Sequence, residues 1–411
     1  MKQSVWVTQI LLLVGCMIMA CKPIEARVED TLQTNVPASD SASSTEAQSA
    51  NPKFVAQGAT YQLMSLVAGL EHPWGMVWLP NGDILVTERA GRLRRIRNGA
   101  LQPTSISGLP PIFAMGQGGL LDIALHPKFA DNQLVYFTYA DGDRNANRTR
   151  VARAQFDGEA LQNWQVIFEA APDKPSAQHF GSRLVWLPDE TLLVSFGDGG
   201  NPPVSVEGDL IRLQAQNLES YLGKVVRIQA DGSIPTDNPK IAGTNGPSAI
   251  WSYGHRNIQG LAYDAISKQI WATEHGSRGG DEINQLRSGA NYGWPLVSHS
   301  REYSTGEPVA PVQSKPGMVD PKIVWTPAIA PSGLAIYRGD RFPQWQGNLF
   351  AGGLVSQDIR RIEVDGQGTV REVEKIDIGQ RVRDVRQGPD GLLYVLTDAP
   401  KGQLLRLEPR L

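Results

Sequence analysis

A two-strand unit recurs along this chain, and it restricts the possible folds more than any other feature of the sequence. Each copy is a short apolar segment, a turn rich in Pro, Asp, Asn or Gly, and a second segment rich in Val, Ile and Leu. The copies span residues 74–87, 120–137, 182–195, 259–273, 332–352 and 382–397. A unit of this size must pack against its neighbours to bury its apolar face. Six copies therefore predict an all-β fold, a six-bladed β-propeller with four-stranded antiparallel blades.

Local turn signals support this interpretation. Asn81-Gly82 and Asp390-Gly391 each separate two apolar segments, and both dipeptides favour a tight β-hairpin. A β-sandwich is the structural alternative, but a sandwich does not need six similar units. Helical periodicity is scarce, and the best candidate for a helix is the segment 209–222.

The N-terminal region has the pattern of a bacterial lipoprotein. Residues 1–20 carry a lysine and then an apolar run, which predicts an export signal. Cys16 and Cys21 each follow a lipobox-like sequence, and Cys21 leaves the signal with the more ordinary length. Lys22 then indicates the outer membrane, whereas secretion without a lipid is the alternative. Residues 21–52 are polar and poor in large apolar side chains, so we expect a disordered tether on the periplasmic side.

The remaining segment, residues 53–411, is expected to form one propeller domain, since it contains no recognisable second linker. It has no cysteine, which suits an oxidising compartment without disulfides. The net charge of the chain is −3, so it has no basic surface of the kind that nucleic acid requires.

Polar side chains recur near the start of the first strand of several units. They are Gln117, His179, Arg256, Asn257, Arg381 and Arg383. The densest group falls between residues 251 and 295, around strands expected at 260–263 and 269–273. Loops of all blades meet at the mouth of a propeller channel, so we expect these side chains to converge there. Arginine is frequent at these positions and acids are few, which indicates an anionic ligand on the axis.

Five sequence blocks carry a resemblance to a known family. They are Gly116-Gln117-Gly118-Gly119-Leu120-Leu121, the segment 253–260 with His255-Arg256-Asn257, the segment 274–284, Asn291-Tyr292-Gly293-Trp294-Pro295, and the segment 381–385. In this order they resemble the soluble pyrroloquinoline quinone (PQQ) dependent sugar dehydrogenases, and in particular the bacterial aldose sugar dehydrogenases. The resemblance covers residues 60–409.

The resemblance implies an activity. An aldose is oxidised at its anomeric carbon to a lactone, and the electrons pass from PQQ to an external acceptor. His179 matches the general base, with Asp198 where the family has an acid near that base. Arg256 matches the residue that stabilises the negative charge on the quinone. The other matched cofactor contacts are Gln117, Asn257, Tyr303, Leu354, Val355, Arg381 and Arg383.

The resemblance also implies calcium. Backbone carbonyls matching Gly276 and Ser277 would hold one ion on the cofactor, and Glu282 and Tyr292 match a structural calcium site. The chain departs from the family pattern at three positions. Ser277 stands where a proline is usual, Gln178 where some members have an acid, and Val355 where a lysine usually reaches the cofactor.

Two other functions stay open at this stage. A propeller lactonase or sugar hydrolase would need a metal held by several acids on the axis, and a binding propeller would have no catalytic group. The sequence predicts an aldose substrate and an external electron acceptor without specifying either, no nucleic-acid partner, membrane contact only through the lipid anchor, and a monomer or a homodimer.

Overall fold

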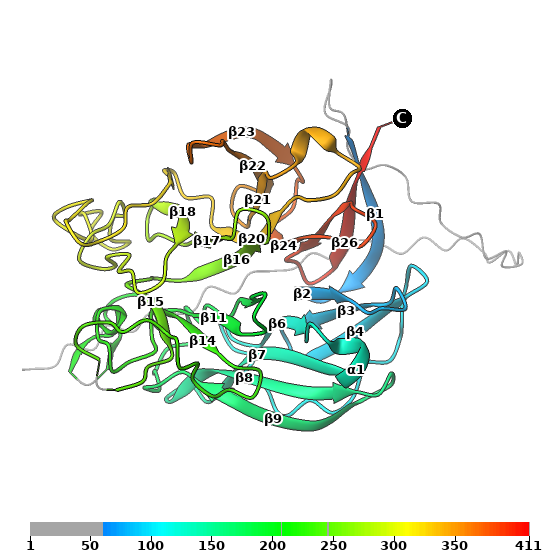
Figure 1. The fold of residues 1–411 in the computed structure, drawn as a ribbon, viewed down its shortest axis with the longest axis horizontal. Helices are drawn as coiled ribbons and strands as arrows, with labels where there is room; N and C mark the ends of the chain where they lie inside the picture. The colour runs from blue at the N-terminus through cyan, green and yellow to red at the C-terminus, as the bar shows by residue number, and fades with distance from the viewer. Residues whose placement is uncertain (1–60, 207, 245, 411) are drawn as a thin grey trace, which may run out of the picture. The chain divides into compact units, whose positions relative to one another are not determined.

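The computed structural model describes residues 61–410 except 207 and 245 (Figure 1). The chain divides into two units, residues 1–48 and 49–411, and all the described residues belong to the second. The predictions for the N-terminal region, which are the export signal, the lipidated Cys16 or Cys21 and the tether, lie outside the described residues.

The described residues form six four-stranded antiparallel sheets, which confirms the predicted six-bladed propeller. The first blade contains β2 (Pro73–Trp78), β3 (Ile84–Glu88), β4 (Arg92–Arg97) and β5 (Ala100–Leu101). The second contains β6 (Leu120–Leu125), β7 (Leu134–Gly142), β8 (Asn147–Phe156) and β9 (Leu161–Glu169). The third contains β10 (Leu184–Trp186), β11 (Leu192–Phe196), β14 (Lys224–Ile228) and β15 (Ile250–Tyr253). The next two are β16 (Ile258–Asp264), β17 (Gln269–Glu274), β18 (Asp281–Leu286) and β19 (Ile323–Trp325); and β20 (Pro331–Ile336), β21 (Leu349–Gly353), β22 (Asp358–Val364) and β23 (Val370–Asp377).

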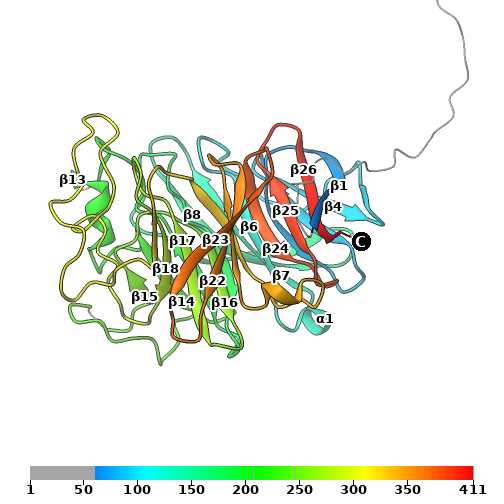
Figure 2. The ribbon, with the colours of Figure 1, turned by 90° about the horizontal axis from the view of Figure 1, so that it is seen from above.

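The sixth blade closes the ring by joining the two ends of the described chain. It contains β24 (Val382–Gln387), β25 (Leu393–Thr397) and β26 (Gly402–Pro409), and its outer strand is β1 (Tyr61–Leu70). Strand β1 pairs antiparallel with β26 along its whole length, and Figure 2 shows the two strands side by side. The first strands of neighbouring blades contact one another around the ring, including β24 with β2.

The six sequence units correspond to the two inner strands of each blade. These strands carry most of the fully buried apolar residues, which form clusters between neighbouring blades. The predicted helix over 209–222 is wrong. Asp209–Leu210 (β13) pairs instead with Ser205–Val206 (β12), and only Ile211–Ala215 forms a 3₁₀ helix, η1. The buried ammonium of Lys224 accounts for the difference, because it binds the carbonyls of Gln214, Ala215 and Leu222.

Two further short helices, α1 (Phe129–Asn132) and the 3₁₀ helix η2 (Pro343–Trp345), lie in connections between strands. Within residues 61–410, leaving out 207 and 245, no helix is long and apolar enough to cross a membrane.

The strand directions place functional residues at one mouth of the propeller. The first strand of a blade runs away from this mouth and the second returns to it, since the two are antiparallel. Residues just before a first strand and just after a second strand therefore meet there.

Candidate active site

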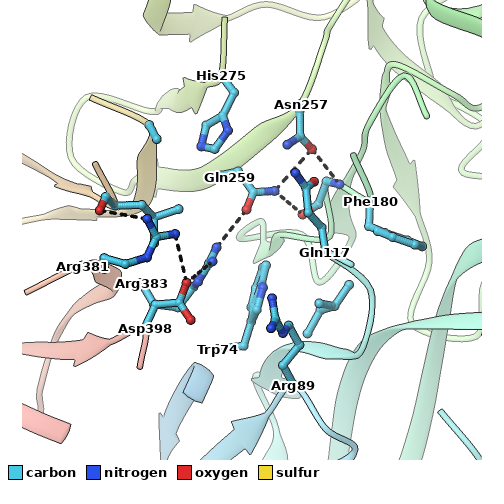
Figure 3. Close-up of a pocket in the computed structure, with 14 residues that line it drawn as sticks. Trp74, Arg89, Gln117, Phe180, Asn257, Gln259, His275, Arg381, Arg383 and Asp398 are labelled. Atoms are coloured by element: carbon cyan, nitrogen blue, oxygen red, sulfur yellow. Dashed lines mark hydrogen bonds and ion pairs between the residues drawn. The ribbon is translucent and has the colours of Figure 1, made fainter. Parts of the chain in front are cut away.

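A cavity of about 180 Å³ lies at this mouth and is lined by residues from all six blades (Figure 3). Five of the predicted cofactor-binding residues line it, namely Gln117, Asn257, Leu354, Arg381 and Arg383. The polar lining, in which arginine is prominent, suits a small, highly polar or anionic molecule.

The sequence analysis missed Trp74, Arg89, Gln259, His275 and Asp398, which also line the cavity. Three of them follow the second strand of a blade directly, since Arg89 follows β3, His275 follows β17 and Asp398 follows β25. The sequence analysis compared only the positions at the first strands. A comparison of the residues that follow the second strand in each unit would have found these three.

His179 forms a buried pair with Asp198. Its Nδ1 lies 2.6 Å from Asp198 Oδ1, and the two side chains are 3% and 0% exposed. Its backbone amide donates to Gln117 Oε1 at 2.8 Å, which ties the base candidate to the cavity wall. The left-handed φ of 49° at His179 is unusual for a non-glycine residue and is held by these contacts.

Burial lowers the pKa of His179, and the neighbouring Arg256 lowers it further, while Asp198 acts in the opposite direction. The imidazole is therefore neutral near pH 7. Because a carboxylate can only accept, Nδ1 carries the proton and Nε2 keeps its lone pair. In the part of the chain that the structure describes, Nε2 makes no hydrogen bond.

Asp198 is fixed by two further donors. Trp294 Nε1 donates to Oδ2 at 2.8 Å and the Gly200 amide donates to Oδ1 at 3.1 Å. Trp294 belongs to the Asn-Tyr-Gly-Trp-Pro block in the insertion between β18 and β19. This block thus orients the acid that in turn orients His179.

Arg256 lies beside this pair without lining the cavity itself. Its guanidinium donates to Asn201 Oδ1 at 2.7 Å and to the His275 carbonyl at 3.2 Å, and it lies 5.4 Å from the Trp294 ring centroid. Its Nε is buried and has no hydrogen-bond partner within the described residues. Asn257 continues the wall, with its Oδ1 accepting the Gly181 amide at 3.1 Å.

Arg381 and Arg383 converge on one carboxylate. Arg383 donates to Asp398 Oδ2 at 2.9 Å and Arg381 to the same oxygen at 3.4 Å. The two arginines do not lie on one regular strand, because β24 begins at Val382 and its register with β25 shifts between Val382 and Asp384. Both still reach Asp398, which lies after the neighbouring strand.

Acids lie near the axis at positions outside those compared between the units. Besides Asp398, Asp122 and Asp384 lie in the channel below the cavity. Arg183 contacts Asp384 at 2.8 Å and Asp122 at 3.5 Å, and Arg386 pairs with both acids. Each acid is matched by an arginine, so the cluster is a buried salt-bridge network that links the second, third and sixth blades and leaves no carboxylate free.

The fold and this site match a family of known enzymes. The model of the glucose/sorbosone dehydrogenase family matches residues 70–406. The chain belongs to this family.

Relatives and solved structures agree with the assignment to the glucose/sorbosone dehydrogenases. An uncharacterised protein of Synechocystis is 58% identical over 402 residues, 96% of each chain. The solved structure of the soluble aldose sugar dehydrogenase of Escherichia coli, in its apo form, is 40% identical with a TM-score of 0.79, and covers 85% of this chain and 100% of its own. The PQQ-bound aldose sugar dehydrogenase of Streptomyces coelicolor is 28% identical with a TM-score of 0.68, covering 84% and 96%.

His275 links this dehydrogenase cavity to the expected calcium carbonyls. Its Nε2 donates to the Pro331 carbonyl at 2.6 Å, and burial lowers its pKa to about 3, so Nδ1 is an acceptor. Gly276 and Ser277 follow it in a tight loop, in which a Cβ at Gly276 would lie 2.3 Å from the Gly279 carbonyl oxygen. Tyr303 donates to the Ser277 carbonyl at 2.9 Å and does not line the cavity.

Two other expected residues lie away from the cavity lining. Val355 is 60% exposed, and Glu282 lies on β18, where it pairs with Glu274 of β17. There Asn284 donates to both Glu282 and Glu274, while its own Oδ1 is buried without a partner in the described part of the chain. Burial, followed by the nearby Glu274, raises the pKa of Glu282 to about 8.

Tyr292 lies next to this group of residues. Its ring stacks on His255 at a centroid distance of 4.7 Å, and His255 Nδ1 lies 3.0 Å from Glu274. The Tyr292 hydroxyl donates to the Gln285 carbonyl and accepts the Arg287 amide. Among the described residues, the backbone carbonyl of Tyr292 accepts no backbone hydrogen bond outside the strands.

Proposed function

We propose that this chain oxidises aldose sugars at the anomeric carbon to lactones, with PQQ as its bound cofactor and an external acceptor for the electrons. The observation that carries the proposal is the buried His179–Asp198 pair, which does not itself line the arginine-lined cavity but lies directly behind its lining residues Gln117 and Phe180. Membership of the glucose/sorbosone dehydrogenase family and the PQQ-bound relative support it.

His179 is suited to remove the proton of the anomeric hydroxyl. The imidazole is neutral near pH 7, Asp198 fixes Nδ1 as the protonated nitrogen, and Nε2 therefore accepts. As the proton arrives, the Asp198 carboxylate stabilises the imidazolium. PQQ, when bound, supplies the quinone that takes up the hydride from the same carbon.

The charges of the cavity fit a polycarboxylate quinone. Three arginines line it and one carboxylate, Asp398, partly offsets them. Arg381 and Arg383 would pair with cofactor carboxylates, and Gln117 and Asn257 would donate to its oxygens. Arg256, whose Nε lacks a partner among the described residues, would stabilise negative charge on a quinone oxygen. Leu354 would pack against the ring, and Tyr303 and Val355 would lie at its rim.

The two expected calcium sites are proposals, and they differ in the ligands that would hold the ion. Among the described residues, no three or more His, Cys, Asp or Glu side chains are grouped to hold a metal. A calcium on the cofactor would therefore depend on the carbonyls of Gly276 and Ser277. At the second site the unpartnered Asn284 Oδ1 and the Glu282 carboxylate fit a hard cation, together with the Tyr292 carbonyl.

A hydrolase is disfavoured by the same structure. Ser252, His255 and Glu274 have the connectivity of a nucleophilic triad, with Ser252 Oγ 2.9 Å from His255 Nε2. Ser252 and His255 are both 0% exposed, so no substrate reaches the serine. The acids of the channel are paired with arginines and are not free to hold a catalytic metal.

Lipid anchoring to the outer membrane through Cys21 remains a proposal that rests on the sequence alone. The direct test of the function is to add PQQ, calcium and an aldose to the purified chain, follow reduction of an acceptor dye, and identify the product. A lactone formed only when PQQ is present would support the proposal, whereas PQQ binding without oxidation of any aldose would refute it.

A further inference from the structure

Arg89 is a charged residue of the cavity that the resemblance did not assign. It follows β3 in the first blade and lines the cavity on the side of Trp74 (Figure 3). Within residues 61–410, its guanidinium makes no hydrogen bond or ion pair, and no dashed line reaches it in Figure 3. The other two arginines of the cavity both contact Asp398.

The charge of Arg89 adds to that of the other two arginines of the cavity. Arg89 is close enough to Arg383 to contribute to the lowered pKa of that residue, after burial and Arg183. Asp398, which could offset the charge, is already shared by Arg381, Arg383 and His72. The cavity thus has an excess of positive charge on the Arg89 side, which an anionic occupant would neutralise.

The backbone of Arg89 is held by two hydrogen bonds, and Gly119 leaves room for the Arg89 side chain. The Arg89 amide donates to the His72 carbonyl at 3.1 Å, and its carbonyl accepts the Leu120 amide at 3.1 Å. A Cβ at Gly119 would lie 2.1 Å from the Arg89 carbonyl oxygen and 2.4 Å from its Cγ. Gly119 in the Gly-Gln-Gly-Gly block is therefore required for the path of the Arg89 side chain.

We propose that Arg89 is a further binding residue of this cavity and that its guanidinium pairs with a carboxylate of the bound quinone. The inference rests on the proposed function for the identity of the ligand. It adds an anion-binding position in the first blade, next to the sixth blade that carries Arg381 and Arg383.

The test compares Arg89→Met with the unaltered chain in direct binding assays. Quenching of tryptophan fluorescence reports occupancy without turnover, because Trp74 lines the same cavity. Each variant is titrated with PQQ and with the neutral PQQ trimethyl ester. We expect Arg89→Met to raise the Kd for PQQ at least tenfold and to leave the Kd for the ester unchanged, because only the acid has carboxylates to lose a charged contact.

Controls separate binding from folding. Arg371→Met makes the same chemical change at a side chain that is 74% exposed on β23, and should leave both Kd values unchanged. The melting temperature of ligand-free Arg89→Met should not fall, since the guanidinium has no partner to lose. If that variant does not fold, Arg89→Gln is titrated in its place.

Equal Kd values in Arg89→Met and the unaltered chain, or an equal loss of affinity for acid and ester, would overturn the proposal. If the unaltered chain binds PQQ and oxidises no aldose, the proposed function fails while the Arg89 comparison stands. If the unaltered chain binds no PQQ, both fail.

Discussion

The substitution Asp198→Asn tests how the base candidate is oriented. The carboxylate of Asp198 accepts from His179, Gly200 and Trp294. An asparagine has one oxygen and one NH₂ group, so either Trp294 alone, or His179 and Gly200 together, must face the NH₂. Indole nitrogen can only donate, whereas imidazole can exchange its tautomer. The Trp294 contact is the shorter of the two contacts from obligate donors, 2.8 Å against 3.1 Å for the Gly200 amide, so we expect the amide oxygen to turn to Trp294 and the NH₂ to His179, with the Gly200 amide losing its acceptor.

The consequence is a change of tautomer. His179 Nδ1 would accept from the amide, Nε2 would carry the proton, and the group facing the substrate could no longer act as a base. General-base catalysis contributes about 10² to 10⁴-fold, and the equivalent Asp-to-Asn change in serine proteases costs about 10⁴-fold. We expect turnover at pH 7 to fall by about 10² to 10⁴-fold, with the Kd for PQQ within about threefold of that of the unaltered chain.

Steady-state dye reduction at saturating PQQ measures the loss, and tryptophan quenching measures PQQ binding. The double variant Asp198→Asn with Trp294→Phe is the matched control. Without the indole donor, the amide oxygen is free to face His179, so part of the turnover should return. Turnover of Asp198→Asn within about threefold of the unaltered chain would refute the tautomer argument, as would a double variant less active than the single one.

Four further substitutions, at His179, Arg383, Glu282 and Cys21, test other parts of the proposed function. His179→Ala should lower turnover by about a hundredfold or more with PQQ still bound, and near-normal turnover in this variant would contradict the role of His179 as the base. The unaltered chain should lose activity only below pH 6.5, because the pKa of His179 is lowered and the base must be unprotonated. Arg383→Ala should raise the PQQ concentration for half-maximal activity by roughly tenfold to a hundredfold, with little change in the KM for sugar, whereas an unaltered PQQ titration would show that the sixth blade does not hold the cofactor. The pKa of Glu282 is raised to about 8, so this residue destabilises the calcium-free fold increasingly as the pH rises from the ordinary pKa of a glutamate toward 8. Glu282→Gln should raise the melting temperature measured without calcium at pH 8, and calcium should no longer change the melting temperature of this variant. A melting temperature that still responds to calcium would place the ion elsewhere. Cys21→Ser should release the chain from the membrane fraction, and anchoring lost only in Cys16→Ser would reverse the choice of cysteine.

The architecture could be predicted because its signals are local. The period-two apolar pattern and the turn at Asn81-Gly82 specify a hairpin from neighbouring residues, and six such hairpins correspond to the inner strands of the blades. The closure of the ring by β1 and β26 could not be predicted in this way. Their pairing joins residues more than 300 positions apart, and no local pattern encodes it.

Part of the site could also be predicted, because some of its residues occupy equivalent positions in the repeated units. Positions before the first strands, such as Gln117 and Asn257, were compared between units and reached the cavity. Arg89 and Asp398 follow second strands that were not compared, and their pairing depends on contacts between blades. The helix prediction over 209–222 failed for the same reason, because the backbone of this segment is bound by the ammonium of Lys224, which lies outside it.

In the proposed function, His179 and the arginine-lined cavity serve one reaction on a bound quinone. Anaerobic mixing of the PQQ-loaded chain with an aldose, followed by the absorbance of the cofactor in a single turnover, tests this without an acceptor. We expect stoichiometric reduction of bound PQQ with one lactone formed per site, and the same end point reached at least about a hundredfold more slowly in His179→Ala. Reduction at equal rates in the two proteins, or no reduction by any aldose in the loaded chain, would contradict it.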